Sequence, residues 1–297
     1  MTSSNIKIGL GTAQFGLDYG ITNRSGEVSD IDLKMILDQS KLVGIDVLDT
    51  AQAYGDAEMR IGKYLQKSPG SYQIISKMSL PADTTLDETI IKNTLQNSLQ
   101  NLGVDELYGM LAHNIKDLVG VYGEIYWNVL KEFKAKGKFT KIGVSVYNAE
   151  EIDLVLDCFD IDLIQLPVNI ADQRLIKSGH LSELKNRNIE IHVRSIFLQG
   201  ILLADQKSFS GQWKSIKPFL DILDEIAGEH KVSRQAIILS QTWKPDLIDK
   251  LIVGVSCQSD FKGLIHAIEE SSRIQDLKIN PPPIDDRLLD PRKWLPK

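Results

Sequence analysis

Short apolar runs rich in β-branched residues alternate with longer amphipathic stretches along nearly all of the 297-residue chain. A short apolar run is typical of a buried strand, and apolar residues spaced three and four apart are typical of a helix. Strands that alternate with helices form βα units around a parallel sheet. This alternation constrains the chain to an α/β fold more strongly than any other feature of the sequence.

The pattern predicts eight strands and at least eight helices. The predicted strands are Ile6–Leu10, Val47–Asp49, Tyr72–Lys77, Leu107–Ala112, Ile142–Val146, Leu163–Leu166, Ile189–Val193 and Leu251–Val255. The first helix is expected after an N-cap at Ser29, with Ile31, Met35, Ile36, Leu42 and Val43 on its apolar face. Later helices are expected at Ala57–Leu65, Thr85–Leu102 (with Thr85 and Glu88 as a capping box), Ile125–Lys136, Glu150–Asp157, Leu181–Arg187, Pro218–Glu229, Ser233–Trp243 and Phe261–Ser271.

Eight βα units without a linker, repeat or charge block between them predict a single (β/α)8 TIM barrel. Single barrels of this kind run to about 250 residues or more, so the length does not require a second domain. We expect the barrel to occupy residues 1–279. The remaining residues, 280–297, form a short Pro-rich C-terminal tail that we expect to pack on the barrel, with Trp294 as an anchor.

Charge and composition exclude several partners. The chain has 34 Lys and Arg against 40 Asp and Glu, for a formal net charge of -6, which argues against nucleic acid. Neither an apolar leader nor a membrane-length apolar run occurs, so we predict a cytoplasmic protein with no membrane partner. Cys158 and Cys257 are the two cysteines, and their separation indicates neither a disulfide framework nor a metal site.

Four polar side chains follow three consecutive predicted strands. Asp49 and Tyr54 lie in LDTAQAYG, Lys77 in IISKM and His113 in MLAHN. Barrel enzymes carry their chemistry at the C-terminal ends of the strands, so we expect these four side chains to converge. Each residue alone is more often structural, but complementary groups on adjacent strand ends favour a catalytic set.

The four residues suit a proton donor for a carbonyl group. A phenol has an ordinary pKa of about 10, and we expect the Lys77 ammonium to lower the pKa of Tyr54. Asp49 would keep Lys77 charged, and His113 would orient and polarise the substrate oxygen. No side chain supplies a hydride, so carbonyl reduction by this set implies a nicotinamide cofactor.

The segments GLGTAQFG, LDTAQAYGDAE, IISKM, LAHN, KIGVS, IQLPVN and IVGVS, in this order, resemble the aldo-keto reductases over nearly the whole chain. The resemblance implies a (β/α)8 barrel that reduces an aldehyde or ketone with NADPH or NADH, with Tyr54 as the general acid. It implies that Ser145 and Gln165 hold the nicotinamide carboxamide. The other expected cofactor contacts are Gly11, Thr12, Asp49, Arg194, Ser195, Leu198, Gly200, Gly254, Ser256 and Lys262.

The sequence departs from the family pattern at three places. Val146 stands where the family usually has Asn, and Arg194 stands where many members have an aromatic ring against the nicotinamide. The arginine could stack in the same way or meet an anionic substrate or the cofactor phosphates. Near the expected 2′-phosphate site, Asp260 stands near the position of the family's cation, and Gly263 and Leu264 stand where its acid and amide would fall. Lys262 could still reach a phosphate, and Asp260 could favour NADH by bonding ribose hydroxyls, so the preference for NADPH over NADH is slight.

Two other functions stay open from the sequence. One is a cofactor-binding regulatory subunit with negligible turnover, as in the channel β subunits of the same family. The other is a barrel lyase in which Lys77 forms a Schiff base, although Asp49 beside it opposes a neutral amine. The substrate is expected to be a small carbonyl compound, sugar-derived or anionic. The sequence does not define the oligomeric state.

Overall fold

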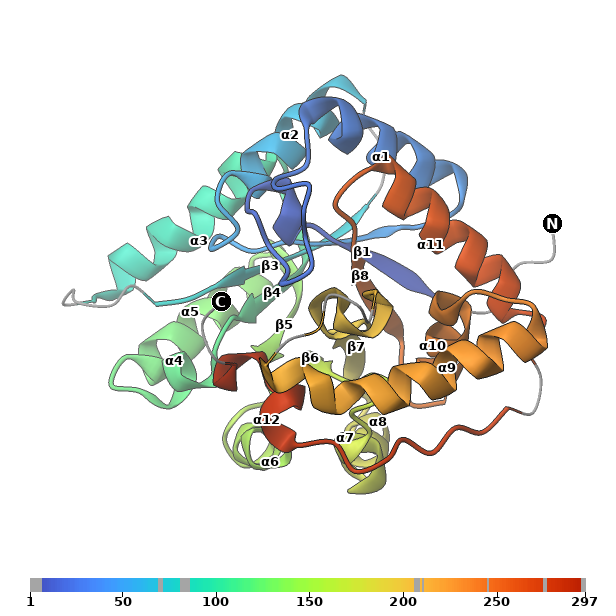
Figure 1. Ribbon diagram of the computed structural model, residues 1–297. Helices are drawn as coiled ribbons and strands as arrows, with labels where there is room; N and C mark the ends of the chain where they lie inside the picture. Colours follow the sequence, from blue (N-terminus) through green and yellow to red (C-terminus); the bar gives the residue numbers. More distant parts are fainter. Residues whose placement is uncertain are drawn as a thin grey trace.

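The computed structural model describes residues 7–68, 72–80, 86–205, 209, 211–244, 246–274 and 277–294. Eight parallel strands close into a barrel in sequence order, with β8 paired to β1, which confirms the predicted (β/α)8 architecture (Figure 1). The strands are β1 (Ile8–Gly11), β2 (Val47–Asp49), β3 (Gln73–Met78), β4 (Leu107–Ala112), β5 (Phe139–Ser145), β6 (Leu163–Pro167), β7 (Glu190–Arg194) and β8 (Lys250–Gly254).

Helices surround the barrel and cover its outer face (Figure 1). In the described segments, no helix combines the length and apolar character needed to cross a membrane. The α-helices are α1 (Asp30–Leu42), α2 (Ala57–Lys67), α3 (Glu88–Leu102), α4 (Ile115–Val119), α5 (Gly123–Ala135), α6 (Ala149–Cys158), α7 (Arg174–Lys177), α8 (His180–Asn186), α9 (Lys217–His230), α10 (Arg234–Thr242), α11 (Gln258–Ser271) and α12 (Asp286–Leu289). Short 3-10 helices cover Ala13–Phe15 (η1), Leu198–Leu203 (η2), Gly211–Ile216 (η4) and Pro291–Lys293 (η5).

The strand register brings the polar strand ends together. Gly11 of β1 pairs with Asp49 of β2 and with Gly254 of β8, and Ser145 of β5 pairs with Gln165 of β6. Inside the barrel an apolar layer separates this end from the opposite one. The layer consists of Val47, Ile75, Leu111, Leu163 and Ile252. Because the interior is filled in this way, the polar groups at the C-terminal end of the strands are separated from those at the opposite end.

Helix α1 has the predicted N-cap but buries a different face from the predicted one. The Ser29 side chain accepts a hydrogen bond from the Asp32 N–H at 3.1 Å, as expected of an N-cap. Of the five residues assigned to the apolar face, only Ile36 is buried, and Ile31 and Leu42 are 74% and 85% exposed. The buried residues are Leu33, Ile36, Leu37 and Ser40, which share one face at helical spacing.

Other element boundaries also differ from the prediction. Helix α3 begins at Glu88 with Asp87 as its N-cap, so Glu88 is not the third residue of a capping box; Thr85 lies outside the described residues, as does Ile6 at the start of the predicted first strand. Strand β5 begins at Phe139, three residues earlier than predicted. The short helices α4 and α7 were not predicted, because isolated helices of four or five residues carry too few apolar repeats to give a pattern.

The C-terminal tail contacts the barrel helices and loops. Trp294 packs edge to face on Trp213 of η4, with ring centroids 4.8 Å apart, and its indole N–H donates to the Leu288 carbonyl at 3.0 Å. Arg174 of α7 forms an ion pair with Asp286 of α12. Trp294 thus contacts η4 through its ring and the tail through its indole N–H.

Candidate active site

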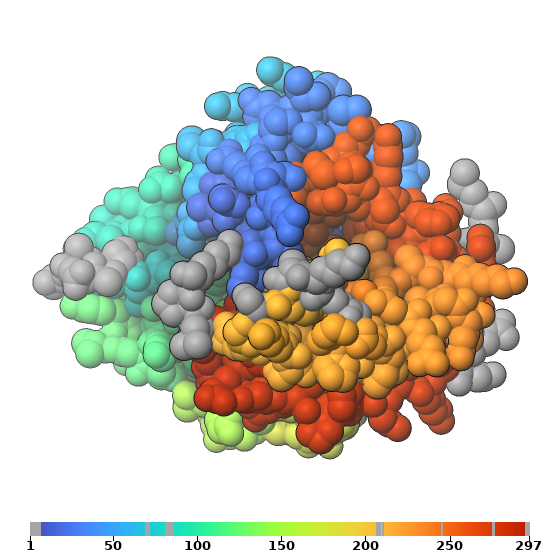
Figure 2. Space-filling view, in the orientation of Figure 1, coloured from blue at the N-terminus to red at the C-terminus, as the bar shows by residue number. Residues whose placement is uncertain are grey.

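A cleft of about 1430 Å³ opens at the C-terminal end of the strands. It runs between the segment after β1 and the start of α11, where the surface in Figure 2 is hollowed between the blue and the orange-red parts of the chain. Three of the four predicted catalytic residues line it, namely Asp49, Tyr54 and His113. The structure therefore brings these three side chains together at one cleft.

Lys77, the fourth residue, lies behind the cleft wall and forms a buried ion pair with Asp49. Its ammonium donates to both Asp49 carboxylate oxygens at 2.7 Å and to the Thr50 carbonyl at 3.0 Å. The Lys77 side chain is 1% exposed and the Asp49 side chain 4%. These three bonds use all three ammonium protons, so the amine is satisfied within the protein.

Tyr54 and His113 lie at the cleft wall next to this ion pair. The Lys77 nitrogen is 5.3 Å from the centroid of the Tyr54 ring. The Tyr54 and His113 rings meet edge to face with centroids 5.8 Å apart. A phenol and an imidazole thus face the same space, and both can form hydrogen bonds with one substrate oxygen there.

The pKa values of Tyr54 and His113 are both shifted by their surroundings, and the shift of Tyr54 is opposite to the expected one. Burial raises the pKa of Tyr54 above its usual value, and the Asp49 carboxylate raises it further, while Arg194 acts in the opposite direction. The Tyr54 pKa is therefore raised rather than lowered as expected, first because burial disfavours the phenolate and second because the Asp49 carboxylate offsets the charge of the Lys77 that it binds. Burial, with the nearby Lys77 charge, lowers the pKa of His113 to about 4. At neutral pH the site presents a protonated phenol and an uncharged imidazole.

Most of the residues expected to hold a cofactor line the cleft. Leu198 and Lys262 do not, since Leu198 is buried in the core and Lys262 is exposed on α11 outside the cleft. The Gln165 amide N–H donates to Asp49 at 2.7 Å, so part of its hydrogen-bonding capacity is used within the protein. The lining residues from the predicted set are Gly11, Thr12, Asp49, Ser145, Gln165, Arg194, Ser195, Gly200, Gly254 and Ser256.

The segment after β7 forms a turn with an unusual backbone. Ser195, Leu198 and Gln199 have positive φ angles of 60°, 48° and 51°, followed by Gly200 at 91°. Non-glycine residues in this region store strain, which is common at ligand sites. A Cβ atom on Gly200 would lie 1.8 Å from the Thr22 hydroxyl oxygen, so glycine is required where this turn meets the segment after β1.

Sequence reasoning missed several residues of the cleft. Tyr147 follows β5 and packs against Arg194, and Gln14 of η1 lies so close to Gly254 that a Cβ there would be 2.6 Å from its amide oxygen. Tyr19, in the segment after β1, also lines the cleft. The spacing pattern carries no signal for such contacts, because they join segments that are distant in the chain. Further lining residues of this kind are Thr22, Asn23, Gln199 and Gln235.

Fold and site together define a (β/α)8 barrel whose titratable groups and polar cleft lie at the C-terminal strand ends. The aldo/keto reductase family profile matches residues 7–279, and the chain belongs to this family.

The curated relatives of the chain include two bacterial reductases that match it over 219 and 218 residues. The NADH-specific methylglyoxal reductase of Escherichia coli (strain K12) is 26% identical over 219 residues, covering 66% of this chain and 65% of that protein. The aldo-keto reductase YhdN of Bacillus subtilis (strain 168) is 28% identical over 218 residues, covering 69% and 63%. The match therefore spans less than two thirds of either relative.

Solved structures of the same family share the fold. The holo form of an aldo-keto reductase from Bacillus halodurans superimposes with a TM-score of 0.68 at 18% identity, covering 92% of this chain and 94% of that one. A Pseudomonas aeruginosa family member gives a TM-score of 0.64 at 20% identity, covering 90% of each chain.

Proposed function

We propose that this chain is an NAD(P)H-dependent reductase that converts an aldehyde or ketone to an alcohol. The observation that carries the proposal is the buried Asp49–Lys77 pair placed directly behind Tyr54, with His113 at the edge of the phenol ring. These residues lie at the cleft of this chain, and two relatives from the same family are named as reductases. In the proposed reaction these residues deliver a proton to the carbonyl oxygen of the substrate, which gains negative charge as hydride is transferred.

Each side chain has a separate role in this proposal. Tyr54 is protonated at neutral pH and donates its proton to the substrate oxygen. His113 is uncharged there, so one ring nitrogen carries a proton and can donate a hydrogen bond to the same oxygen. Lys77 and Asp49 are positioning residues, because their bonds keep the pair and the wall behind Tyr54 in place.

The cleft suits a dinucleotide together with a small substrate. Its volume exceeds the ~300–1,000 Å³ that is usual for one drug-sized ligand. Ser145, Gln165, Ser195 and Ser256 supply hydrogen-bonding groups along it, and Gly254 leaves room where a larger side chain would strike Gln14. When bound, the reduced nicotinamide would supply the hydride that the side chains cannot.

The choice between NADPH and NADH depends on the start of α11. Asp260 lines the cleft and accepts a hydrogen bond from the Ser256 N–H at 3.1 Å, whereas Lys262 lies outside the cleft. A carboxylate at this wall repels a phosphate group, and the expected lysine contact is absent from the described lining. The sequence favours NADPH slightly, but this arrangement supports NADH as an equally good cofactor.

The two alternative functions have different structural support. A Schiff base on Lys77 requires a free amine in the cleft, but the amine makes three hydrogen bonds behind the cleft wall. The geometry therefore disfavours a lyase. A regulatory subunit would use the same cofactor cleft, and turnover separates it from a reductase.

The test is steady-state oxidation of NADH and NADPH with a panel of aldehydes, ketones and keto-sugars. We expect turnover in the wild-type protein and a decrease in kcat of about 10²–10⁴-fold in Tyr54→Phe, since that variant loses the proton donor. Tyr122→Phe is the matched control, because Tyr122 lies outside the cleft. Full activity in Tyr54→Phe would refute the role of Tyr54. Tight cofactor binding without turnover of any carbonyl would favour the regulatory subunit.

A further inference from the structure

Arg194, the last residue of β7, differs from the other arginines in its charge environment. The chain has nine arginines, and six of them form ion pairs with carboxylates: Arg60, Arg174, Arg187, Arg234, Arg287 and Arg292. Arg24 and Arg273 are exposed to solvent. Arg194 is only partly exposed, and no carboxylate of the described residues lies within ion-pair distance of its guanidinium.

The Arg194 side chain crosses the mouth of the barrel toward the catalytic residues. It starts on β7, next to Pro167 of β6, and its guanidinium donates to the Val146 carbonyl after β5 at 3.0 Å. Strand β5 is the neighbour of β4, after which His113 lies. Arg194 lowers the pKa values of Tyr54 and His113, so its charge reaches both rings.

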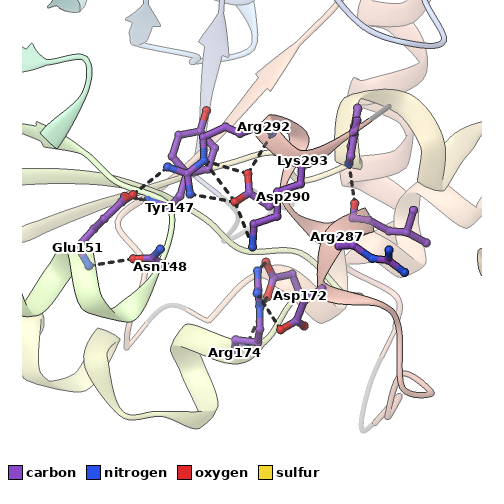
Figure 3. Close-up of polar contacts among 12 residues, drawn as sticks. Tyr147, Asn148, Glu151, Asp172, Arg174, Arg287, Asp290, Arg292 and Lys293 are labelled. Atoms are coloured by element: carbon purple, nitrogen blue, oxygen red, sulfur yellow. Dashed lines mark hydrogen bonds and ion pairs between the residues drawn. The ribbon is translucent and has the colours of Figure 1, made fainter. Parts of the chain in front are cut away.

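The guanidinium is held in place before any ligand binds. Its central carbon lies 4.0 Å from the centroid of the Tyr147 ring. Arg292 from the C-terminal tail lies 3.8 Å from the same centroid, and Arg292 is in turn bound to Glu151 and Asp290 (Figure 3). This contact lies at the central carbon of the Arg194 guanidinium, and N–H groups remain for other hydrogen bonds. Within the described residues, its hydrogen bonds are the one to Val146 and a long contact of 3.5 Å to the Ser195 hydroxyl.

We propose that Arg194 binds a carboxylate of the substrate, so that the enzyme acts on carbonyl compounds that carry a carboxylate near the carbonyl group. The part of this inference that concerns turnover rests on the proposed function. The part that concerns binding of a carboxylate by Arg194 does not. A half-buried cation without a carboxylate partner among the described residues favours an anionic ligand, and the planar guanidinium edge matches a carboxylate in two-pronged geometry. The described lining has one further arginine, the exposed Arg24, so the charge near the rings suits a monoanion better than a phosphate group.

A pair of substrates with the same ketone isolates the charge. Phenylglyoxylate and its methyl ester differ in the carboxylate alone, and the readout is the ratio of their kcat/KM values. We expect the wild-type protein to prefer the acid and Arg194→Gln to reduce the acid-to-ester ratio about 10²-fold, with Arg194→Lys in between because an ammonium lacks the planar edge. Arg273→Gln, an exposed arginine outside the cleft, should keep the wild-type ratio.

Binding experiments separate this inference from its alternatives. Calorimetric titration of the product-like acid mandelate should show binding to the wild-type protein and about 10²-fold weaker binding to Arg194→Gln. This titration does not need turnover, so it decides the inference even if the proposed reaction is wrong. Three outcomes would overturn it: a wild-type protein that prefers the ester, equal mandelate binding by both proteins, or a loss of NADH and NADPH affinity in Arg194→Gln as large as the loss for mandelate. The last outcome would assign Arg194 to the cofactor. Inorganic phosphate that binds more tightly than mandelate would equally contradict a carboxylate site.

Discussion

At the residue scale, the site combines two groups whose protonation is stabilised in opposite ways. Tyr54 keeps its proton because burial and Asp49 disfavour the phenolate. His113 loses its second proton because burial and Lys77 disfavour the imidazolium. The protein thus holds a donor phenol and a neutral imidazole over the whole neutral range. This is the state that carbonyl reduction needs.

These pKa directions predict the pH dependence of the reaction. The protonated phenol is the active form for reduction, and its raised pKa places the loss of this form above the alkaline end of an ordinary assay. The neutral imidazole is the active form of His113, and its pKa of about 4 places its loss at the acidic end. We therefore expect kcat for reduction to be flat between about pH 6 and pH 10. A limb with an apparent pKa near 7 or 8 in the measured kcat profile would contradict this.

The Asp49–Lys77 pair predicts a large, non-additive effect on stability. Lys77→Met leaves a buried carboxylate without its cation and should lower the free energy of unfolding by about 3–5 kcal/mol. Asp49→Asn combined with Lys77→Met should lower it by less than the sum of the two single changes. Urea unfolding gives the free energy of unfolding of the two single variants and of the double variant. Lys34→Met is the control, since Lys34 pairs with Asp38 on the exposed face of α1 and should cost at most about 1 kcal/mol. Additive effects of the two buried changes would show that the pair is not coupled.

At the element scale, the C-terminal tail supports the loop after β5. Glu151 of α6 accepts hydrogen bonds from the Tyr147 N–H at 2.6 Å and from Arg292 at 2.8 Å. Asp290 is buried and binds the same arginine at 2.9 Å (Figure 3). The tail therefore fixes one face of Tyr147 while Arg194 packs on the ring as well.

This arrangement predicts a role for the tail in selectivity. Arg292→Gln removes a cation–π contact worth about 0.5–2 kcal/mol and frees the Tyr147 ring, so Arg194 loses part of its support. We expect the acid-to-ester ratio of kcat/KM to fall by about 2- to 30-fold, with a smaller change for the ester than for the acid. Arg287→Gln is the control, because the exposed Arg287 pairs with Asp285 of the tail, and no other ion pair of Arg287 is found among the described residues. An equal change in both variants would mean that the tail acts through general stability.

At the scale of the whole molecule, the end of the barrel opposite the cleft holds a second polar cluster. Glu190 at the start of β7 accepts hydrogen bonds from Tyr108 and His192, each at 2.6 Å, and binds Lys141. Burial alone would raise the pKa of Glu190, but these hydrogen bonds lower it to about 2. The apolar layer inside the barrel separates this cluster from the cleft, so we expect it to contribute to stability.

The lowered pKa predicts how acid unfolds the protein. An unfolded glutamate has a pKa of about 4.3, so the stabilisation from Glu190 is complete above that pH and disappears as the pH falls toward 2. Glu190→Gln should therefore be less stable than the wild type at pH 7, and the difference should shrink between about pH 5 and pH 2. Urea unfolding at several pH values measures it, with the exposed Glu183→Gln as control. A difference independent of pH would show that the charge of Glu190 is not responsible.

Helix α1 shows where prediction from sequence stops. Ile31, Met35 and Leu42 repeat at helical spacing and so do Leu33, Ile36 and Leu37, so the pattern fits two faces of one helix. Packing on the barrel buries the second set and leaves the first in solvent. Similarly, Arg194 could be located at a strand end from the sequence, but its contacts with Val146 and Tyr147 could not.

The amino-acid sequence by itself determined the order of strands and helices, the barrel, and the four residues at adjacent strand ends. These follow from local spacing and from the rule that parallel strands bring their C-terminal ends together. Only the tertiary structure decided that Asp49 offsets the charge of Lys77 beside Tyr54, that Lys262 lies outside the cleft, and that the tail supports Tyr147. The physical reason is that protonation and side-chain contacts depend on burial and on distances between segments that are far apart in the chain.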